Sequence, residues 1–165
     1  MTATPQHVRP EIQGLFERAR DLVRASTLFD SCDITDDGRL VAHASEAPEE
    51  VLYRIELDGD ALYVAWVSAN RYISQSIEAE LMWTGDDLDD LIDEELADTG
   101  WNAGALASLE HFRNDEQLFT FRSRLPFGPA DSDPEHAAKQ LLCCLEAYEA
   151  AFRELGDMKA EEDDD

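Results

Sequence analysis

A chain of 165 residues, 44% of them apolar, is long enough to fold as one domain around a core and too apolar for a disordered segment. Its 38 Asp and Glu face 13 Lys and Arg, and the resulting net charge of -25 repels nucleic-acid phosphates and anionic membrane surfaces. Basic proteins, basic peptides and cations remain as partners, unless the acidic excess serves only solubility in a salt-rich cytoplasm.

The sequence carries no recognisable signal for export or membrane insertion. The N-terminal segment MTATPQHVRPEI lacks the apolar centre of a secretory signal, and no apolar run has the length of a transmembrane helix. Cys32, Cys143 and Cys144 are an odd set with an adjacent pair, which makes a poor disulfide framework. We therefore expect reduced thiols and a cytoplasmic protein.

The first third of the chain begins with a helix and continues less regularly. A helix over residues 10–25 opens with Pro10, a favoured first position, and its apolar residues recur at helical spacing. Residues 26–49 lack a clear period. Within them, the turn signal TDDG at 35–38 precedes a short predicted strand at 39–42.

Alternating residues predict strands in the middle of the chain. Residues 51–57 are apolar at the odd positions, and the turn Asp58-Gly59 joins them to a strand over 61–69 that is apolar on both faces and therefore central. A third strand is predicted over 71–81. A helix is the rival there, because a four-residue step also connects Ile73, Ile77 and Leu81.

A helix and two strands are predicted next. The helix starts at Thr84, where Asp87 three residues on resembles a capping box, and it ends at Gly100. Strands over 109–113 and 118–125 flank a loop of hairpin length.

The strongest periodic pattern lies near the C-terminus. A helix over 134–155 has Ser132 or Asp133 as its cap, an apolar face with steps of four and three residues, and Gly156 at its end. The acidic residues 158–165 are predicted to be a disordered tail.

These elements define the expected fold class. Their order is helix, three strands, helix, two strands, helix, and long helices before and after an antiparallel sheet of about five strands give a two-layer α+β sandwich. Neither an internal repeat nor a linker divides the chain, so we expect residues 1–157 to form a single domain.

Motifs that bind metals or perform catalysis are incomplete or missing. Residues 33–38 resemble the start of a calcium loop, but its twelfth position is Ala44 where a bidentate Glu is required. The four histidines are scattered, and Cys143 and Cys144 point about 100° apart on a helix, so neither set suits zinc. No GxSxG, SxxK or glycine-rich phosphate loop occurs. We expect no metal, no cofactor and no enzymatic activity.

Two groups of side chains are candidates for contacting a partner. The predicted second helix is rich in carboxylates, and residues such as Asp89, Asp90 and Asp93 would form an acidic docking surface for a partner. Trp83 precedes this helix and Trp101 follows it, so the two tryptophans would line a groove at either end of that surface. The alternative is a solvated helix face. Arg122 and Arg124 share one face of the last strand. There they either contact a partner or form cross-strand ion pairs with some of the chain's many acidic side chains.

The element order resembles the type III secretion chaperone-like fold, a group that includes the bacterial YbjN-type domains. The likeness lies in residues 51–100 and in the block EHFRNDEQLFTFRSRLPFG followed by HAAKQLLCCLEAYEAAFRELGD, about two thirds of the chain together. The resemblance implies a small acidic cytoplasmic protein without cofactors, often dimeric, that binds extended protein segments or acts in regulation.

The sequence thus predicts a non-enzymatic protein-binding module, a chaperone-like or regulatory adaptor. An exposed sheet edge would pair with an extended segment, apolar pockets near Trp83 and Trp101 would supply specificity, and the acidic helix would attract a basic partner. Two alternatives stay open. One is an acidic decoy that occupies a nucleic-acid-binding protein, and the other is an enzyme whose site is assembled from distant residues.

Overall fold

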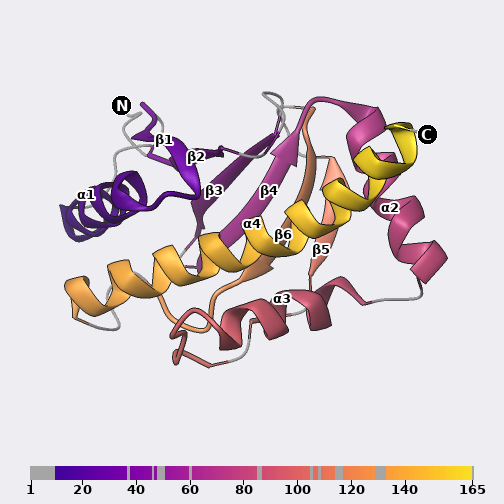
Figure 1. Cartoon of the computed structure of the whole chain (residues 1–165). Coiled ribbons are helices and arrows are strands. Elements are labelled where there is room, and N and C mark those ends of the chain that lie inside the picture. The colour runs from indigo at the N-terminus through magenta and orange to yellow at the C-terminus, as the bar shows by residue number, and fades with distance from the viewer. Residues whose placement is uncertain are drawn as a thin grey trace.

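Helices lie against one face of an antiparallel sheet (Figure 1). The computed structural model describes residues 10–36, 38–45, 47, 51–59, 61–84, 87–104, 106–107, 109–113, 117–128 and 133–164, with the side chains of the last helix described as far as Arg153. The elements are α1 (Pro10–Ala25), β1 (Phe29–Ile34), β2 (Leu40–Ala44), β3 (Val51–Asp58), β4 (Ala61–Ser68), α2 (Arg71–Thr84), α3 (Leu88–Ala97), β5 (Glu110–Arg113), β6 (Phe119–Arg124) and α4 (Pro134–Asp164).

The sheet has six strands in the order β1-β2-β3-β4-β6-β5, and every neighbouring pair is antiparallel. The predicted α+β class is confirmed, and the described residues form six strands where about five were expected and four helices in place of three. The predicted hairpin between β3 and β4 is also confirmed. It turns at Gly59, whose φ of 65° lies in the left-handed region that glycine adopts at little cost.

The core forms where α4 crosses the sheet in Figure 1. The ring of Trp66 is 1% exposed and stacks on Phe152 of α4 with centroids 5.3 Å apart. Phe121 of β6 meets the same tryptophan edge-on at 5.4 Å. Between them, the Ser123 and Tyr148 hydroxyls share a buried 2.6 Å hydrogen bond that satisfies both groups.

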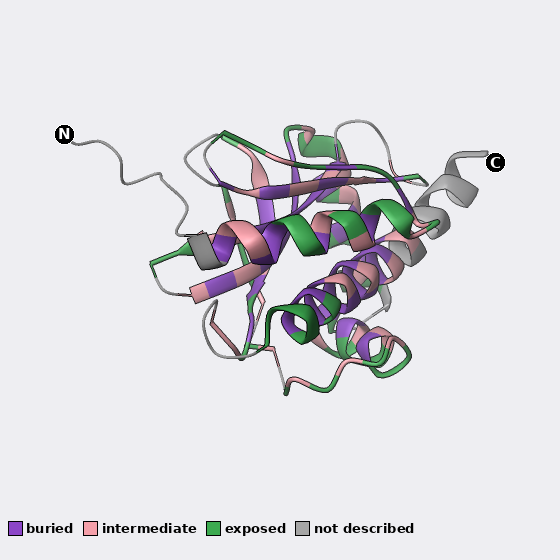
Figure 2. Cartoon of the chain, turned by 90° about the vertical axis from the view of Figure 1, so that its left-hand side faces the viewer, coloured by how far each residue is buried: buried purple, intermediate pink, exposed green. Residues whose placement is uncertain are grey.

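Helix α1 packs beside α4 and against β1. Its buried and exposed residues recur along the helix in Figure 2, which is the pattern of one buried face, and Ile12, Phe16 and Ala19 are completely buried. The predicted bounds 10–25 are confirmed.

Three regions differ from the sequence prediction. Residues 26–49 contain a hairpin, β1 and β2, where only a short strand at 39–42 was expected. The strand predicted over 71–81 is wrong, because these residues belong to the helix α2. The helix predicted to start at Thr84 begins at Leu88, and Thr84 is the last residue of α2.

The C-terminal helix is longer than expected. Pro134 opens it and the Asp133 side chain accepts a 3.3 Å hydrogen bond from the His136 N–H, as a cap at Asp133 predicts. The end predicted at Gly156 is wrong, and residues 158–164, expected as a disordered tail, form the last turns of α4. A single glycine costs a helix only about 1 kcal/mol, and the Met, Lys, Ala and Glu residues that follow it are good helix formers.

Candidate protein-binding surface

Helix α2 begins at a side-chain cap. The Oδ1 atom of Asn70 accepts hydrogen bonds from the N–H groups of Tyr72 (2.9 Å) and Ile73 (3.3 Å), which satisfies donors that an uncapped helix would leave unpaired. The Ser68 hydroxyl in turn accepts from the Asn70 N–H at 3.0 Å. Asparagine at this position was the signal in the sequence that favours helix over strand for the residues after it.

The outer face of α2 carries an exposed apolar stripe. Tyr72 is 76% exposed, and Met82 and Trp83 are each 84% exposed; among the described residues these three are the exposed large apolar side chains. At about 100° per residue, Tyr72, Ala79 and Trp83 lie within roughly 20° of one line along the helix, and Met82 lies about 80° to one side. We call these four residues the α2 stripe.

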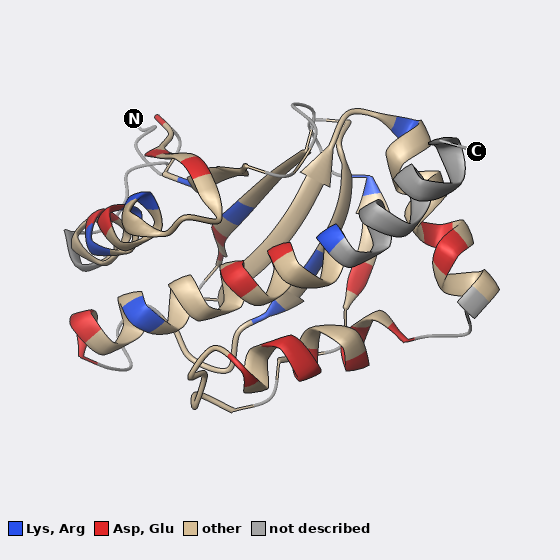
Figure 3. Ribbon diagram, in the orientation of Figure 1, with Lys and Arg blue, Asp and Glu red and all other residues tan. Residues whose placement is uncertain are grey.

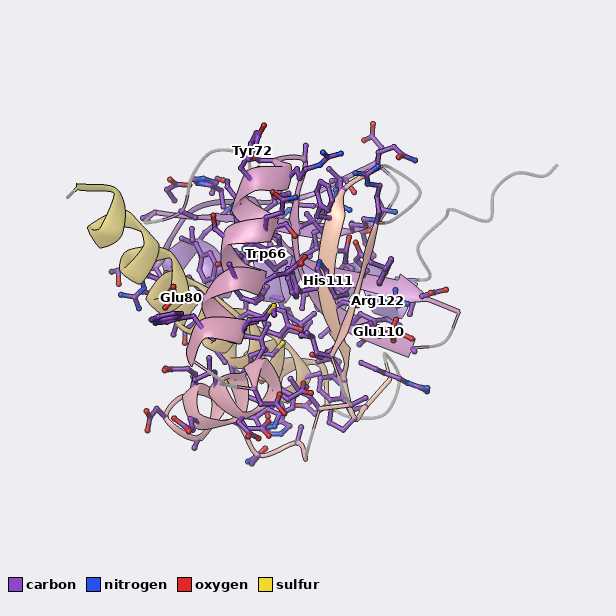
Figure 4. The ribbon with its side chains drawn as sticks, turned by 90° about the vertical axis from the view of Figure 1, so that its right-hand side faces the viewer. Trp66, Tyr72, Glu80, Glu110, His111 and Arg122 are labelled. Carbon is purple, nitrogen blue, oxygen red and sulfur yellow. The ribbon has the colours of Figure 1, made fainter. Side chains whose placement is uncertain are left out.

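The inner face of α2 is held against β5. His111 Nε2 lies 3.4 Å from both Ser74 Oγ and Glu78 Oε2, and the imidazole ring stacks on Phe121 with centroids 3.8 Å apart (Figure 4). A catalytic triad would use both ring nitrogens, one for the nucleophile and one for the carboxylate. Here both partners approach the same nitrogen and Ser74 is 1% exposed, so the cluster fixes the position of α2.

One carboxylate of α2 is buried without a donor. Glu80 is 5% exposed, and its Oε2 atom has no hydrogen-bond partner in the described part of the chain. It lies on the side of α2 that faces α4, as the labelled view in Figure 4 shows. A buried charged oxygen without a donor is costly, so this atom is a strong acceptor for any cation that can reach it.

The acidic side chains of α3 have different roles. Figure 3 shows acidic residues along the length of this helix, in a stretch where the sequence has no Lys or Arg between Arg71 and Arg113. Asp87 caps the helix by accepting from the Asp89 N–H at 2.9 Å, which corrects the predicted start at Thr84. Asp90 and Asp93 are exposed and available to a partner.

Asp89 also has a structural contact. Its Oδ1 atom accepts a 3.0 Å hydrogen bond from the Leu109 N–H, which attaches α3 to the chain just before β5. Burial raises the pKa of the Asp89 carboxyl, the hydrogen bond from Leu109 opposes the shift, and the neighbouring carboxylates add to it. Of the three predicted acidic site residues, Asp89 therefore contributes to the fold as well as to the surface charge.

Trp101, predicted to line the same groove as Trp83, packs against the core instead. Its indole N–H donates a 2.6 Å hydrogen bond to the Gly104 carbonyl, and its ring lies 6.2 Å from that of Phe127. The two tryptophans thus differ: Trp83 is exposed on α2 and Trp101 is part of the packing after α3.

The structure does not bring Arg122 and Arg124 together with α2. They lie on the sheet face opposite to Phe121, because successive residues of β6 point to opposite faces. The Arg122 guanidinium lies 3.8 Å from the Tyr63 ring centroid and pairs with Glu110 (3.3 Å) and Asp58 (3.6 Å). Arg122 and Glu110 are register partners, so the predicted cross-strand pair is confirmed for this arginine.

The sheet edges offer little free main chain. At one edge, Arg24 Nε of α1 donates a 2.9 Å hydrogen bond to the Cys32 carbonyl of β1, and its Nη2 pairs with Asp33 at 2.8 Å. At the other edge, β5 is four residues long. Short and covered edges disfavour strand addition, so the α2 stripe is the stronger candidate surface.

The cysteines lack the properties of nucleophiles. All three thiols are buried, and burial raises the pKa of Cys32 to about 12 and that of Cys144 well above its ordinary value. Cys143 donates to the Thr99 carbonyl at 3.2 Å. Within the described ranges, no group of three His, Cys, Asp or Glu side chains comes close enough to hold a metal ion.

Comparison with protein-family models, with curated proteins and with solved structures found no match. None of the helices in the part of the chain that the structure describes offers the long apolar stretch that a bilayer crossing needs.

Proposed function

We propose that this protein is a non-enzymatic protein-binding module, a chaperone-like or regulatory adaptor, whose partner sits on the α2 stripe. The observation that carries the proposal is the exposure of Tyr72, Met82 and Trp83 on one helix. A group of exposed apolar side chains on one surface often marks an interaction site, whereas isolated exposed apolar side chains are normal on protein surfaces.

The residue types of the stripe support the same proposal. Tryptophan and tyrosine are enriched among the residues that dominate binding energy, because each buries a large rigid surface at little cost in conformational entropy. Methionine adapts its shape to irregular partners. The helix that presents them is fixed by the Asn70 cap and by its buried inner face, so the surface is ordered before a partner arrives.

The alternatives from the sequence have less support. An acidic decoy would use carboxylates alone and leaves the exposed Trp83 and Met82 without a role. An enzyme would need convergent polar groups around an accessible reactive atom, and the Ser74, Glu78 and His111 cluster has its serine buried.

The test is affinity capture from native lysate with the protein as bait, followed by mass spectrometry. Met82→Ala with Trp83→Ala removes most of the stripe while keeping good helix formers, and Ser31→Ala changes an exposed polar residue of β1, at the opposite edge of the sheet, as a control. We expect wild type and Ser31→Ala to retain a common partner and the double variant to lose it by about tenfold or more. The free energy of unfolding should change by less than about 0.5 kcal/mol. Equal recovery by all three would overturn the proposal.

A further inference from the structure

We infer that the element bound by the α2 stripe is a cationic amphipathic helix, with its apolar face on Tyr72, Met82 and Trp83 and its Lys or Arg side chains beside the flanking carboxylates. This inference rests on the proposed function and specifies the chemistry of the partner. Two observations carry it: the charge around the stripe, and the buried carboxylate of Glu80 at its margin.

Carboxylates flank the stripe on both sides. On the helix circumference, Glu78 lies next to Met82 and Glu80 lies about 60° beyond Trp83, on the other side of the stripe. Asp90 and Asp93 of the following helix are exposed, and the chain has no Lys or Arg between Arg71 and Arg113. A partner with positive charge on either side of an apolar face would match this pattern.

Glu80 adds to the negative potential beside the stripe. Its Oε2 atom is buried on the side of α2 that faces α4, and no residue in the described part of the chain donates to it. An ammonium or guanidinium group of a partner lying along Trp83 would be attracted by this charge without touching the buried oxygen.

The geometry of the stripe favours a helical partner. Tyr72 and Trp83 are eleven residues apart, about 16 Å along α2, which three turns of a partner helix would match. A helix surface has no free main-chain groups to pair with an extended strand, so side-chain packing must supply the affinity. Helix-on-helix packing with apolar anchors at steps of three and four residues does this.

Charge also argues against two other occupants. A second copy would bring another net charge of -25, and an isologous contact would set Glu78 and the acids of α3 against their equivalents. An anionic membrane surface would be repelled for the same reason. A basic helix would be attracted and not repelled, because its charge is opposite in sign to that of this protein.

The test uses a fluorescein-labelled peptide of about 18 residues, built from Leu and Lys at amphipathic helical spacing, and fluorescence anisotropy. Two control peptides are a scrambled Leu/Lys sequence of equal composition and a Leu/Glu peptide of the same pattern. The proteins are wild type, Met82→Ala with Trp83→Ala, Glu80→Gln, and Ser31→Ala. Thermal unfolding verifies that each variant is folded, and Glu80→Gln should be no less stable because it removes a buried charge without a donor.

We expect the patterned Leu/Lys peptide to bind wild type and Ser31→Ala equally. The double variant should weaken binding by about tenfold, Glu80→Gln by several-fold, and a rise in salt from roughly 50 to 300 mM by several-fold. The scrambled and Leu/Glu peptides should bind at least about tenfold more weakly.

Four results would overturn the inference. Equal binding of the scrambled peptide would mean that net charge attracts any polycation. Equal binding of the Leu/Glu peptide would mean that apolar contact alone matters. Stripe-dependent dimers in sedimentation, or stripe-dependent binding to phosphatidylserine vesicles, would identify a different occupant. The proposed function is judged separately, because lysate capture that the Met82 and Trp83 changes abolish would stand even if no peptide binds.

Discussion

Asp89 combines an acidic surface position with a partly buried contact. Its Oδ1 atom accepts from the Leu109 N–H, and burial raises the pKa of its carboxyl. A carboxyl whose pKa is raised by folding stabilises the protein only while protonated, at pH below its unfolded pKa. That contribution is lost as the pH rises through the folded pKa. At neutral pH the charge on Asp89 therefore opposes folding, while its hydrogen bond favours it.

Two variants separate these effects. Asp89→Asn keeps an oxygen for the Leu109 N–H and removes the charge, so its free energy of unfolding should exceed that of wild type at about pH 7. The difference should shrink as the pH falls toward roughly 4. Asp89→Ala loses the acceptor and should be less stable than Asp89→Asn by about 1 kcal/mol. Urea unfolding across this pH range measures both, and equal stability of the two variants would contradict a role for the Leu109 contact.

At the scale of elements, α2 positions the surface and Asn70 positions α2. Asn70→Ala removes the oxygen that serves the Tyr72 and Ile73 N–H groups, and should lower the free energy of unfolding by about 1 kcal/mol. Asn70→Asp is the matched control, because aspartate caps a helix equally well. Hydrogen exchange should quicken in residues 71–84 of the alanine variant. Unchanged exchange there, with unchanged stability, would mean that packing alone holds the helix.

The elements that could be predicted from sequence are those with one unambiguous period. The helix at 10–25, the hairpin of 51–57 with 61–69, and the strand at 118–125 are confirmed within a residue or two. Residues 71–81 satisfy two periods at once, because Ile73, Ile77 and Leu81 are both odd-numbered and four residues apart. Only the cap at Asn70 decides between them.

Strand β1 has a different reason for being missed. Its buried residues, Phe29 and Cys32, are three positions apart, and the register with β2 shifts between Phe29 and Ser31. An irregularity of this kind interrupts the two-residue alternation by which strands are recognised. The hairpin turn after it, at 35–38, was visible in the sequence.

The candidate surface was predicted only in part, because residues 71–81 were predicted to be a strand. Trp83 belongs to the α2 stripe, and Asp90 and Asp93 are exposed on α3. Tyr72 and Met82 were missed because a strand over 71–81 does not place Tyr72 on one line with Trp83, whereas a helix does. Trp101 could not be placed from sequence, since its packing on Phe127 depends on residues distant in the chain.

At the scale of the whole molecule, the acids of α2 and α3 lie in a stretch of sequence that has no Lys or Arg between Arg71 and Arg113. On the sheet face away from these helices, Arg54 and Arg122 form ion pairs with Glu56, Asp58 and Glu110. Figure 3 shows the acidic segments along α2 and α3. This distribution would orient an approaching basic partner toward α2 before contact.

The central claim is that a protein partner contacts α2 at its exposed apolar residues. Site-specific photo-crosslinking in native lysate tests it most directly, with a benzophenone amino acid in place of Met82 and, as the control, in place of Glu17, an exposed residue of α1. The account predicts a discrete crosslinked adduct with another protein from position 82, reduced when Trp83→Ala is added, and none from position 17. Adducts from position 17 alone, or equal adducts from both positions, would contradict it.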